Sequence, residues 1–271
     1  RPSRSAATRW FIMTTQIDRF SLVTAPLSLL YNDQHLSDAT GFIWQRNKQN
    51  YLITNWHVAS GRNARDGTSL QNHGGRPNII CARFNTRMQD FEKQEHFIRI
   101  RDEEDKPLWL AHPSRGRRID VVAIPLPHAD NDPIFALHPI NKYIADQMTI
   151  RIAMEVFVLG YPFGPEPPGY PVWKRGSMAS EPDLARIGTG YYLIDTASRP
   201  GMSGSPVIRR IWNQRVDGDK VIPAPTPLRT EFIGVYSGRR HTKDKSDAQL
   251  GIVWPRHCIE EIIIGNKRDE D

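Results

Sequence analysis

Three short segments, far apart in the chain, carry side chains that could together activate a nucleophile. Ser203 lies in a glycine-rich loop, His57 follows a largely apolar run, and Asp120 opens another apolar run. A serine hydroxyl is a weak nucleophile at neutral pH. It needs a base within hydrogen-bond reach and a third group that orients the base. Serine, histidine and aspartate supply these parts if the fold brings them together.

Each residue alone has a more common explanation. A histidine after an apolar strand is usually packed or solvated, an aspartate at a strand start is usually a turn residue, and a serine between glycines usually marks a loop. The three together, in this order and with structured flanks, favour a catalytic triad. Ser205 is a rival nucleophile, but Pro206 beside it favours packing. Because position 205 is not glycine, the Gly-x-Ser-x-Gly elbow of α/β-hydrolases is not met.

We expect neither a metal nor a cofactor. The other histidines show no spacing of the His-x-x-x-His kind that binds a metal from one helix face. They are His35, His73, His96, His112, His128, His138, His241 and His257.

The composition is typical of a β-rich globular protein. Of the 271 residues, 39% are hydrophobic and 24% are charged. The 21 prolines and 19 glycines favour many short strands joined by turns. The chain has no run of about 18 apolar residues, so no membrane span is expected. The net charge is +6, but the basic clusters lack interleaved aromatic residues, so we do not expect nucleic acid as a partner.

The two cysteines, Cys81 and Cys258, are too few for a disulfide framework. We expect two buried free thiols, with a single disulfide between them as the alternative. Free thiols favour a reducing compartment, and no signal segment follows Arg1, so a cytoplasmic location is expected.

The chain divides into two β-rich halves. Strands are expected at residues 41–44, 51–54, 79–84, 96–100 and 121–126, and then at 156–159, 172–178, 191–194, 206–211, 231–236 and 250–254. A C-terminal helix is predicted by Pro255, by the spacing of Ile259, Ile262 and Ile263, and by Gly265.

The remaining segments are assigned to connections and ends. The polar stretches 63–78, 101–118 and 211–230 are expected to be surface loops. Residues 1–8 are expected to be disordered, and residues 10–13 to form an added strand.

Several motifs resemble those of trypsin-like serine proteases, most closely the Deg/HtrA-type and related bacterial peptidase domains. In the first half, residues 39–43 and 51–58 are similar to the first-barrel motif with its histidine, and residues 120–124 are similar to the aspartate strand. In the second half, residues 156–164 with 174–176 are similar to the early second-barrel hairpin, and residues 200–206 to the nucleophile loop. Residues 234–237 and 251–255 are similar to later strands. Any one motif is weak evidence, but five in order are specific, and they run from residue 39 to residue 264.

The resemblance implies an all-β fold. It consists of two six-stranded antiparallel β-barrels, with the active site in the cleft between them, and a C-terminal helix. The whole chain, 1–271, is then one domain, with a first barrel at 9–126, a linker at 127–146, a second barrel at 147–254 and the helix at 255–265.

The resemblance also implies a serine endopeptidase that forms an acyl-enzyme. By matching position, Ser203 is the nucleophile, His57 is the general base and then acid, and Asp120 orients the imidazole. The N–H groups of Gly201 and Ser203 form the oxyanion hole, and Ser237 donates a hydrogen bond to Asp120 from behind.

The pocket for the residue before the cleaved bond is expected to be small and apolar. In the family, the residue six before the nucleophile lies at the pocket base. Here it is Ala197, which offers no carboxylate to a Lys or Arg side chain. The expected walls are Ser198, Arg199, Ser237, Gly238, Arg239 and Ile252, with Gly251 as the alternative to Ile252.

Two other functions are alternatives. One is a glutamate-specific endopeptidase; Tyr236 counts against it, because those enzymes place a histidine there. The other is a catalytically silent protease-fold module that binds peptides.

The chain departs from the family pattern in two places. Met202 occupies a slot that is aspartate in digestive trypsins and asparagine in Deg/HtrA proteins, and there is no Ile-Val-Gly-Gly start for zymogen activation. A protein or peptide substrate is expected, and an activating protein partner or a fused regulatory domain is a further candidate partner.

Overall fold

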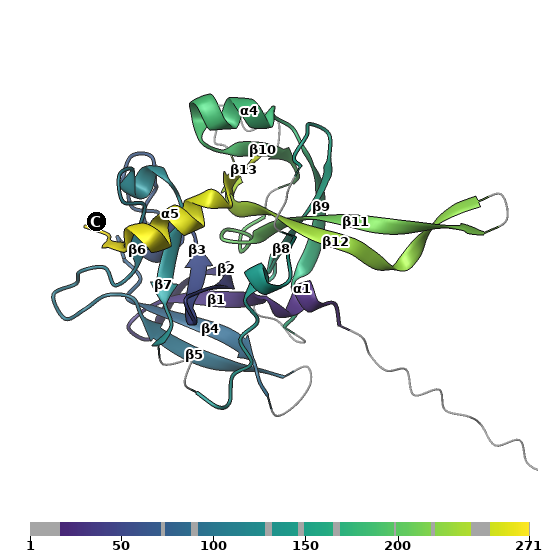
Figure 1. The fold of residues 1–271 in the computed structure, drawn as a ribbon. Helices are drawn as coiled ribbons and strands as arrows, with labels where there is room; N and C mark the ends of the chain where they lie inside the picture. Colours follow the sequence, from purple (N-terminus) through teal and green to yellow (C-terminus); the bar gives the residue numbers. More distant parts are fainter. Residues whose placement is uncertain are drawn as a thin grey trace, which may run out of the picture.

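The computed structural model describes residues 17–71, 74–87, 92–127, 132–145, 149–164, 169–197, 199–217, 220–239 and 250–270. The expected disorder at 1–8 and the expected strand at 10–13 lie outside these residues. Strands form most of the regular structure and make up two units (Figure 1). The all-β prediction is confirmed.

The first unit is an eight-stranded sheet in the order β14-β6-β7-β3-β2-β1-β4-β5. Its strands are β1 (Thr24–Tyr31), β2 (Gln34–Arg46), β3 (Gln49–Thr54), β4 (Ile79–Asn85), β5 (Lys93–Arg99), β6 (Leu110–Ala111), β7 (Val122–Pro125) and β14 (Lys267–Arg268). The resemblance implied six strands here. The short strands β6 and β14, which pair with each other, extend the sheet to eight.

The second unit is a closed barrel of six strands, as expected, in the order β10-β13-β12-β11-β8-β9. Its strands are β8 (Glu155–Gly160), β9 (Val172–Met178), β10 (Tyr192–Asp195), β11 (Pro206–Asp217), β12 (Lys220–Arg239) and β13 (Leu250–Pro255). Buried apolar side chains such as Val158, Val207 and Ile233 form a cluster of this unit's own.

Short helical segments complete the fold. They are α1 (Arg19–Leu22), α2 (Trp56–Ser60), η1 (Gly116–Arg118), η2 (Ile140–Lys142), α4 (Pro182–Leu184), η3 (Ala185–Thr189) and α5 (His257–Gly265). The expected loop 101–118 therefore contains strand β6 and the turn η1.

Strands β11 and β12 extend beyond the barrel as a two-stranded arm (Figure 1). The prediction of a surface loop at 211–230 is wrong, because β11 and β12 stay paired along most of that segment. Near the root of the arm, the fully buried carboxylate of Glu231 lies 3.2 Å from Arg209 and 2.7 Å from Arg229. Two guanidinium groups thus compensate one buried charge.

Strand β1 lies between β2 and β4 and was not predicted. Pro26 interrupts its pattern and cannot donate a ladder hydrogen bond. Pro26 pairs with Thr40 on β2, whereas pairing with β4 begins only at Leu27, opposite Ala82. The proline is tolerated because β1 has a neighbour on only one side at that point.

A shared apolar cluster joins the two units. The rings of Phe42 and Trp44 on β2 lie 5.4 and 5.6 Å from the ring of Phe232 on β12. Helix α5 adds Ile259 and Ile262, both fully buried. This packing fixes one unit against the other.

Both cysteines are free and buried, as predicted. None of the helices within the described ranges has the length and apolar character needed to cross a membrane.

Candidate active site

His57 lies on the first turn of helix α2, directly after strand β3. Thr54 at the end of β3 pairs with Val122 on β7, so the chain leaves the sheet close to Asp120. Asn55, the fully buried residue before the helix, donates its side-chain amide to the Asp120 carbonyl oxygen at 2.8 Å. The backbone around Asp120 is thereby tied to the start of the helix that carries the imidazole.

The Asp120 carboxylate is almost fully buried and accepts three hydrogen bonds. Its Oδ1 accepts the backbone N–H of His57 at 2.8 Å, and its Oδ2 lies 2.7 Å from Nδ1 of the same residue. The Ser237 hydroxyl also donates to Oδ2, which is the expected contact. His57 of the first unit, with two hydrogen bonds, and Ser237 of the second unit thus meet at this carboxylate.

Burial and charge act in opposite directions on this pair. Burial lowers the pKa of His57, but the charge of Asp120 and the hydrogen bond to it raise the pKa, and the net shift is upward. Burial raises the pKa of Asp120, but the charge of His57 and the hydrogen bonds from His57 and Ser237 lower it, and the net shift is downward. The carboxylate therefore stays ionised beside an imidazole of increased basicity.

Ser203 lies in the turn before β11, and its Oγ is 3.0 Å from Nε2 of His57. With the Nδ1 proton directed at Asp120, Nε2 is free to accept the serine proton. The structure thus brings all three predicted residues into one hydrogen-bonded series that crosses between the two units.

Hydrogen bonds hold the loop around Ser203 on both sides. The Ser203 carbonyl accepts the Thr40 N–H at 2.8 Å, the Gly201 carbonyl accepts the Thr40 hydroxyl at 2.7 Å, and the Gly204 N–H donates to the Tyr236 carbonyl at 2.9 Å. Within the described part of the chain, the N–H groups of Gly201 and Ser203 have no acceptor. Both donors are therefore available to a ligand.

Gly204 has no room for a side chain. Its φ is +84°, and a Cβ would lie 2.0 Å from the Thr40 carbonyl oxygen. We expect Gly204→Ala to lower the free energy of unfolding by at least about 3 kcal/mol, because left-handed strain adds to a backbone clash. Urea unfolding measures the loss. Gly74→Ala is the matched control, with φ +72° and open space, and it should cost about 1 kcal/mol. Equal costs at the two positions would contradict the crowding at Gly204.

Comparison with known protein families identifies the family of this chain. Residues 39–213 match the trypsin-like peptidase domain, which is more than half of the 271 residues. The chain belongs to the trypsin-like peptidase family. Among curated proteins, the comparison finds no match.

Solved structures similar to this trypsin-like peptidase domain include proteases of two bacteria. The active form of the Rv3671c protease from M. tuberculosis is 16% identical with a TM-score of 0.47, and the match covers 92% of this chain and 82% of that one. Its inactive form is 17% identical with a TM-score of 0.46, and covers 91% and 88%. The serine endoprotease from Yersinia pestis is 14% identical with a TM-score of 0.51, and covers 91% and 63%. At this identity the similarity to the Yersinia protein concerns the fold alone.

Two of the expected pocket residues of this peptidase domain lie beside the triad. Ser237 contacts Asp120, and a Cβ at Gly238 would lie 3.6 Å from the Ser203 Oγ. Ile252 on β13 is mostly buried and packs in the cluster that joins the two units.

The other expected pocket residues are exposed or not described. Ala197 and Arg199 are exposed, between β10 and the nucleophile loop. Ser198 and the side chain of Arg239 lie outside what the structure describes.

Thr40 has a role at the site that the sequence motifs do not indicate. Its fully buried hydroxyl accepts the Tyr161 N–H at 3.1 Å while it donates to the Gly201 carbonyl. The available signal was a polar side chain inside a run of small and apolar strand residues, where a buried hydroxyl must find a partner.

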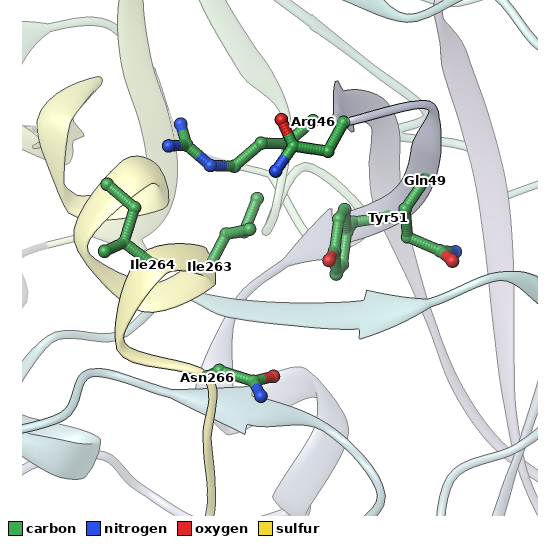
Figure 2. A pocket seen from close by; sticks show the side chains of 7 residues that line it. Arg46, Gln49, Tyr51, Ile263, Ile264 and Asn266 are labelled. Carbon is green, nitrogen blue, oxygen red and sulfur yellow. The ribbon is translucent and has the colours of Figure 1, made fainter.

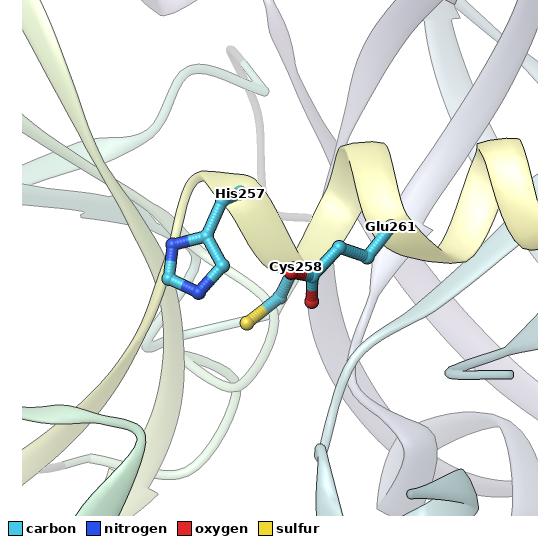
Figure 3. A group of neighbouring side chains, drawn as sticks. All are labelled: His257, Cys258 and Glu261. Atoms are coloured by element: carbon cyan, nitrogen blue, oxygen red, sulfur yellow. The ribbon is translucent and has the colours of Figure 1, made fainter. Parts of the chain in front are cut away.

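A group of potential metal ligands lies on helix α5, outside the triad (Figure 3). His257, Cys258 and Glu261 each place a ligand atom within 4.8 Å of the others. Glu261 is already hydrogen-bonded to His112 at 2.9 Å, and burial raises the pKa of the Cys258 thiol to about 12. A protonated thiol and an engaged carboxylate are weak ligands, so we assign no ion to this group.

A pocket of about 400 Å³ lies between the β2–β3 hairpin and helix α5 (Figure 2). Its lining residues are Arg46, Asn47, Gln49, Tyr51, Ile263, Ile264 and Asn266. None of them belongs to the triad, so this pocket is not the candidate active site.

Proposed function

We propose that this peptidase domain is a serine endopeptidase that hydrolyses peptide bonds through an acyl-enzyme. The observation that carries the proposal is the continuous series from the Ser203 Oγ to His57 to Asp120, with separations of 3.0 and 2.7 Å. Such a series takes the proton from an attacking hydroxyl and stabilises the imidazolium that results.

The residues then act in two steps. In the first, the Ser203 Oγ attacks the carbonyl carbon, and its proton passes to Nε2 of His57. The imidazolium returns that proton to the leaving amine as the C–N bond breaks, which leaves an ester on Ser203. In the second, His57 takes a proton from water, the resulting hydroxide adds to the ester, and Ser203 leaves with the proton.

The N–H groups of Gly201 and Ser203 are proposed to bind the oxygen that becomes negative in both steps. Their lack of an acceptor within the described residues supports this role. A donor of this kind typically contributes about 3 to 4 kcal/mol to the stability of the transition state.

We propose cleavage after small or medium apolar residues such as Ala, Val or Leu. Ala197 at the expected pocket base carries no charge that would select a basic side chain. Digestion of a peptide library, followed by sequencing of the new ends, tests this preference. Products that end mainly in glutamate would instead support the glutamate-specific alternative.

Labelling with a fluorophosphonate probe tests the proposed function directly, because the probe bonds only to an activated serine. We expect a single adduct, mapped to Ser203 by mass spectrometry, together with cleavage of unfolded casein. A chain that binds peptides but neither labels nor cleaves would be a silent binding module.

The pH dependence of kcat/KM should follow the protonation of His57. The base must be neutral to accept the serine proton, so activity falls as the pH drops through the His57 pKa. Since that pKa is raised above its usual 6.5, the midpoint of the acid limb should lie above pH 6.5. The Asp120 pKa is lowered, so the carboxylate stays ionised throughout this range.

A pH profile with a substrate that has no ionisable group near the cleaved bond measures this midpoint. Below it, the rate should fall about tenfold per pH unit, as for one essential base. A flat profile from pH 5 to 8 would rule out His57 as the base.

A further inference from the structure

Lys93 joins the edge of the first sheet to the second unit. It is the first residue of strand β5, and its Nζ donates to the Thr24 carbonyl at 3.0 Å and to the Tyr161 hydroxyl at 2.9 Å. The ammonium also lies 5.4 Å from the centre of the Tyr161 ring and 5.8 Å from that of Tyr170. Within the described residues, Lys93 forms no ion pair with a carboxylate.

Tyr161, which follows β8, is held at both its side chain and its backbone. Its hydroxyl accepts a hydrogen bond from Lys93 and donates one to the Gly169 carbonyl at 3.1 Å. Its backbone N–H donates to the Thr40 hydroxyl at 3.1 Å. The side chain is almost fully buried, so the ring and the backbone cannot move independently.

The backbone of Tyr161 lies directly against Gly201. A Cβ at Gly201 would be 2.2 Å from the Tyr161 carbonyl oxygen, and the φ of Gly201 is +83°. The Thr40 hydroxyl that accepts from Tyr161 donates in turn to the Gly201 carbonyl at 2.7 Å. The orientation of the peptide groups on either side of Gly201 is therefore set by where Tyr161 lies.

We propose that Lys93 is a positioning residue for the oxyanion hole: it holds Tyr161 in place, and Tyr161 with Thr40 holds the Gly201 peptide group toward the substrate. Lys93 does not touch the substrate. This inference rests on the proposed peptidase function, and it extends the site to a strand that carries none of the triad.

Stability alone does not account for a lysine here. Burial lowers the pKa of Lys93 to about 7, which shows that this environment disfavours the charged amine. Burial, together with the charges of Arg19 and Lys93, also lowers the pKa of His138. An apolar side chain of similar length should therefore fold as well as lysine or better.

The test compares Lys93→Met with the parent and with Arg99→Met, a control at the exposed far end of the same strand. For Lys93→Met we expect kcat to fall about tenfold to hundredfold with little change in KM, since a small misplacement of a catalytic group has this effect. The inhibition constant of a peptidyl trifluoromethyl ketone, whose adduct carries an oxyanion, should rise by the same factor as kcat/KM falls. The melting temperature should stay equal or increase.

The outcomes separate the two proposals. A parent that neither cleaves nor labels overturns the endopeptidase function, and this inference with it. A reactive parent whose Lys93→Met variant keeps kcat, or loses activity only through KM or only through a lower melting temperature, overturns the inference alone. If Lys93→Met does not fold, Tyr161→Phe removes the hydroxyl that accepts from Lys93 and keeps the ring. Its kcat should fall likewise, and an unchanged kcat would overturn the inference.

Discussion

Replacement of Ser203 by alanine should lower kcat by about 10⁶-fold, because the variant has no atom that can form the acyl bond. Some hydrolysis should persist above the rate in water, since the proposed oxyanion donors, the N–H groups of Gly201 and Ser203, remain. Steady-state cleavage of a fluorogenic peptide, with covalent labelling in parallel, measures both changes. The fold should be unaffected, because the one side-chain hydrogen bond of Ser203 among the described residues goes to the imidazole.

Ser205→Ala is the matched control for this substitution. The Ser205 hydroxyl lies two residues from the nucleophile, is fully buried and has no hydrogen-bond partner within the described residues. Its removal leaves no unsatisfied group behind, so kcat should stay within about twofold of the parent value. If instead Ser205→Ala were inactive and Ser203→Ala active, the nucleophile would be Ser205 and the proposed triad would be wrong.

Replacement of Asp120 by asparagine should lower kcat by about 10⁴-fold at neutral pH while the fold is retained. The amide is isosteric with the carboxylate, but it directs an N–H group at one of the two His57 contacts and removes the charge that raises the pKa of the imidazole. His57 then favours the tautomer with its proton on Nε2, which cannot accept from Ser203.

Ser237→Ala provides the comparison for Asp120. It removes one hydrogen bond to the carboxylate and leaves the charge and both contacts to His57, so we expect a loss of about tenfold. The pH profiles of the two variants should differ as well, since only Asp120→Asn removes the anion beside the imidazole. Equal losses in the two variants would mean that the carboxylate acts only through its hydrogen bonds.

The hydrogen-bonded series of Ser203, His57 and Asp120 was predictable because the three residues occur together, in order, beside structured segments. His57 follows an apolar strand, Asp120 stands just before another, and Ser203 lies in a glycine-rich loop. These patterns are local in the sequence, so they can be recognised without knowledge of how the two units pack. The closed second barrel follows for the same reason from its well-separated apolar strands.

The arm was not predictable, because it extends beyond the barrel and its strands need not alternate apolar and polar residues. A two-stranded ribbon with solvent on both faces needs paired backbones but no apolar alternation. Its sequence is polar, and β12 contains Pro223, Pro225 and Pro227, which are typical of loops or edge strands. These prolines lie in the part of β12 that pairs with β11 alone, because pairing of β12 with β13 begins only at Gly234 among the described residues.

The partners of the residues that support the loop around Ser203 could not be predicted from the sequence. Thr40 and Gly201 are 161 residues apart, and Lys93 and Tyr161 are 68 residues apart. Thr40, Tyr161 and Gly201 lie in quoted motifs, but no motif indicates which of these residues meet. Each hydrogen bond arises only because Thr40 on β2 and the Lys93 side chain at the start of β5 come close to the second unit in the fold.

The arm also indicates where the chain can tolerate insertions and deletions. The strand that starts just after Ser203 and the strand that ends beside Ser237 are the two halves of a single hairpin, paired from the catalytic end outward. Residue pairs gained or lost at the far end of the two strands, beyond the pair of Asp217 and Lys220, therefore lengthen or shorten the arm without altering the register at its base. Evolution or protein engineering can thus vary the length of this arm while the residues around Ser203 keep their positions.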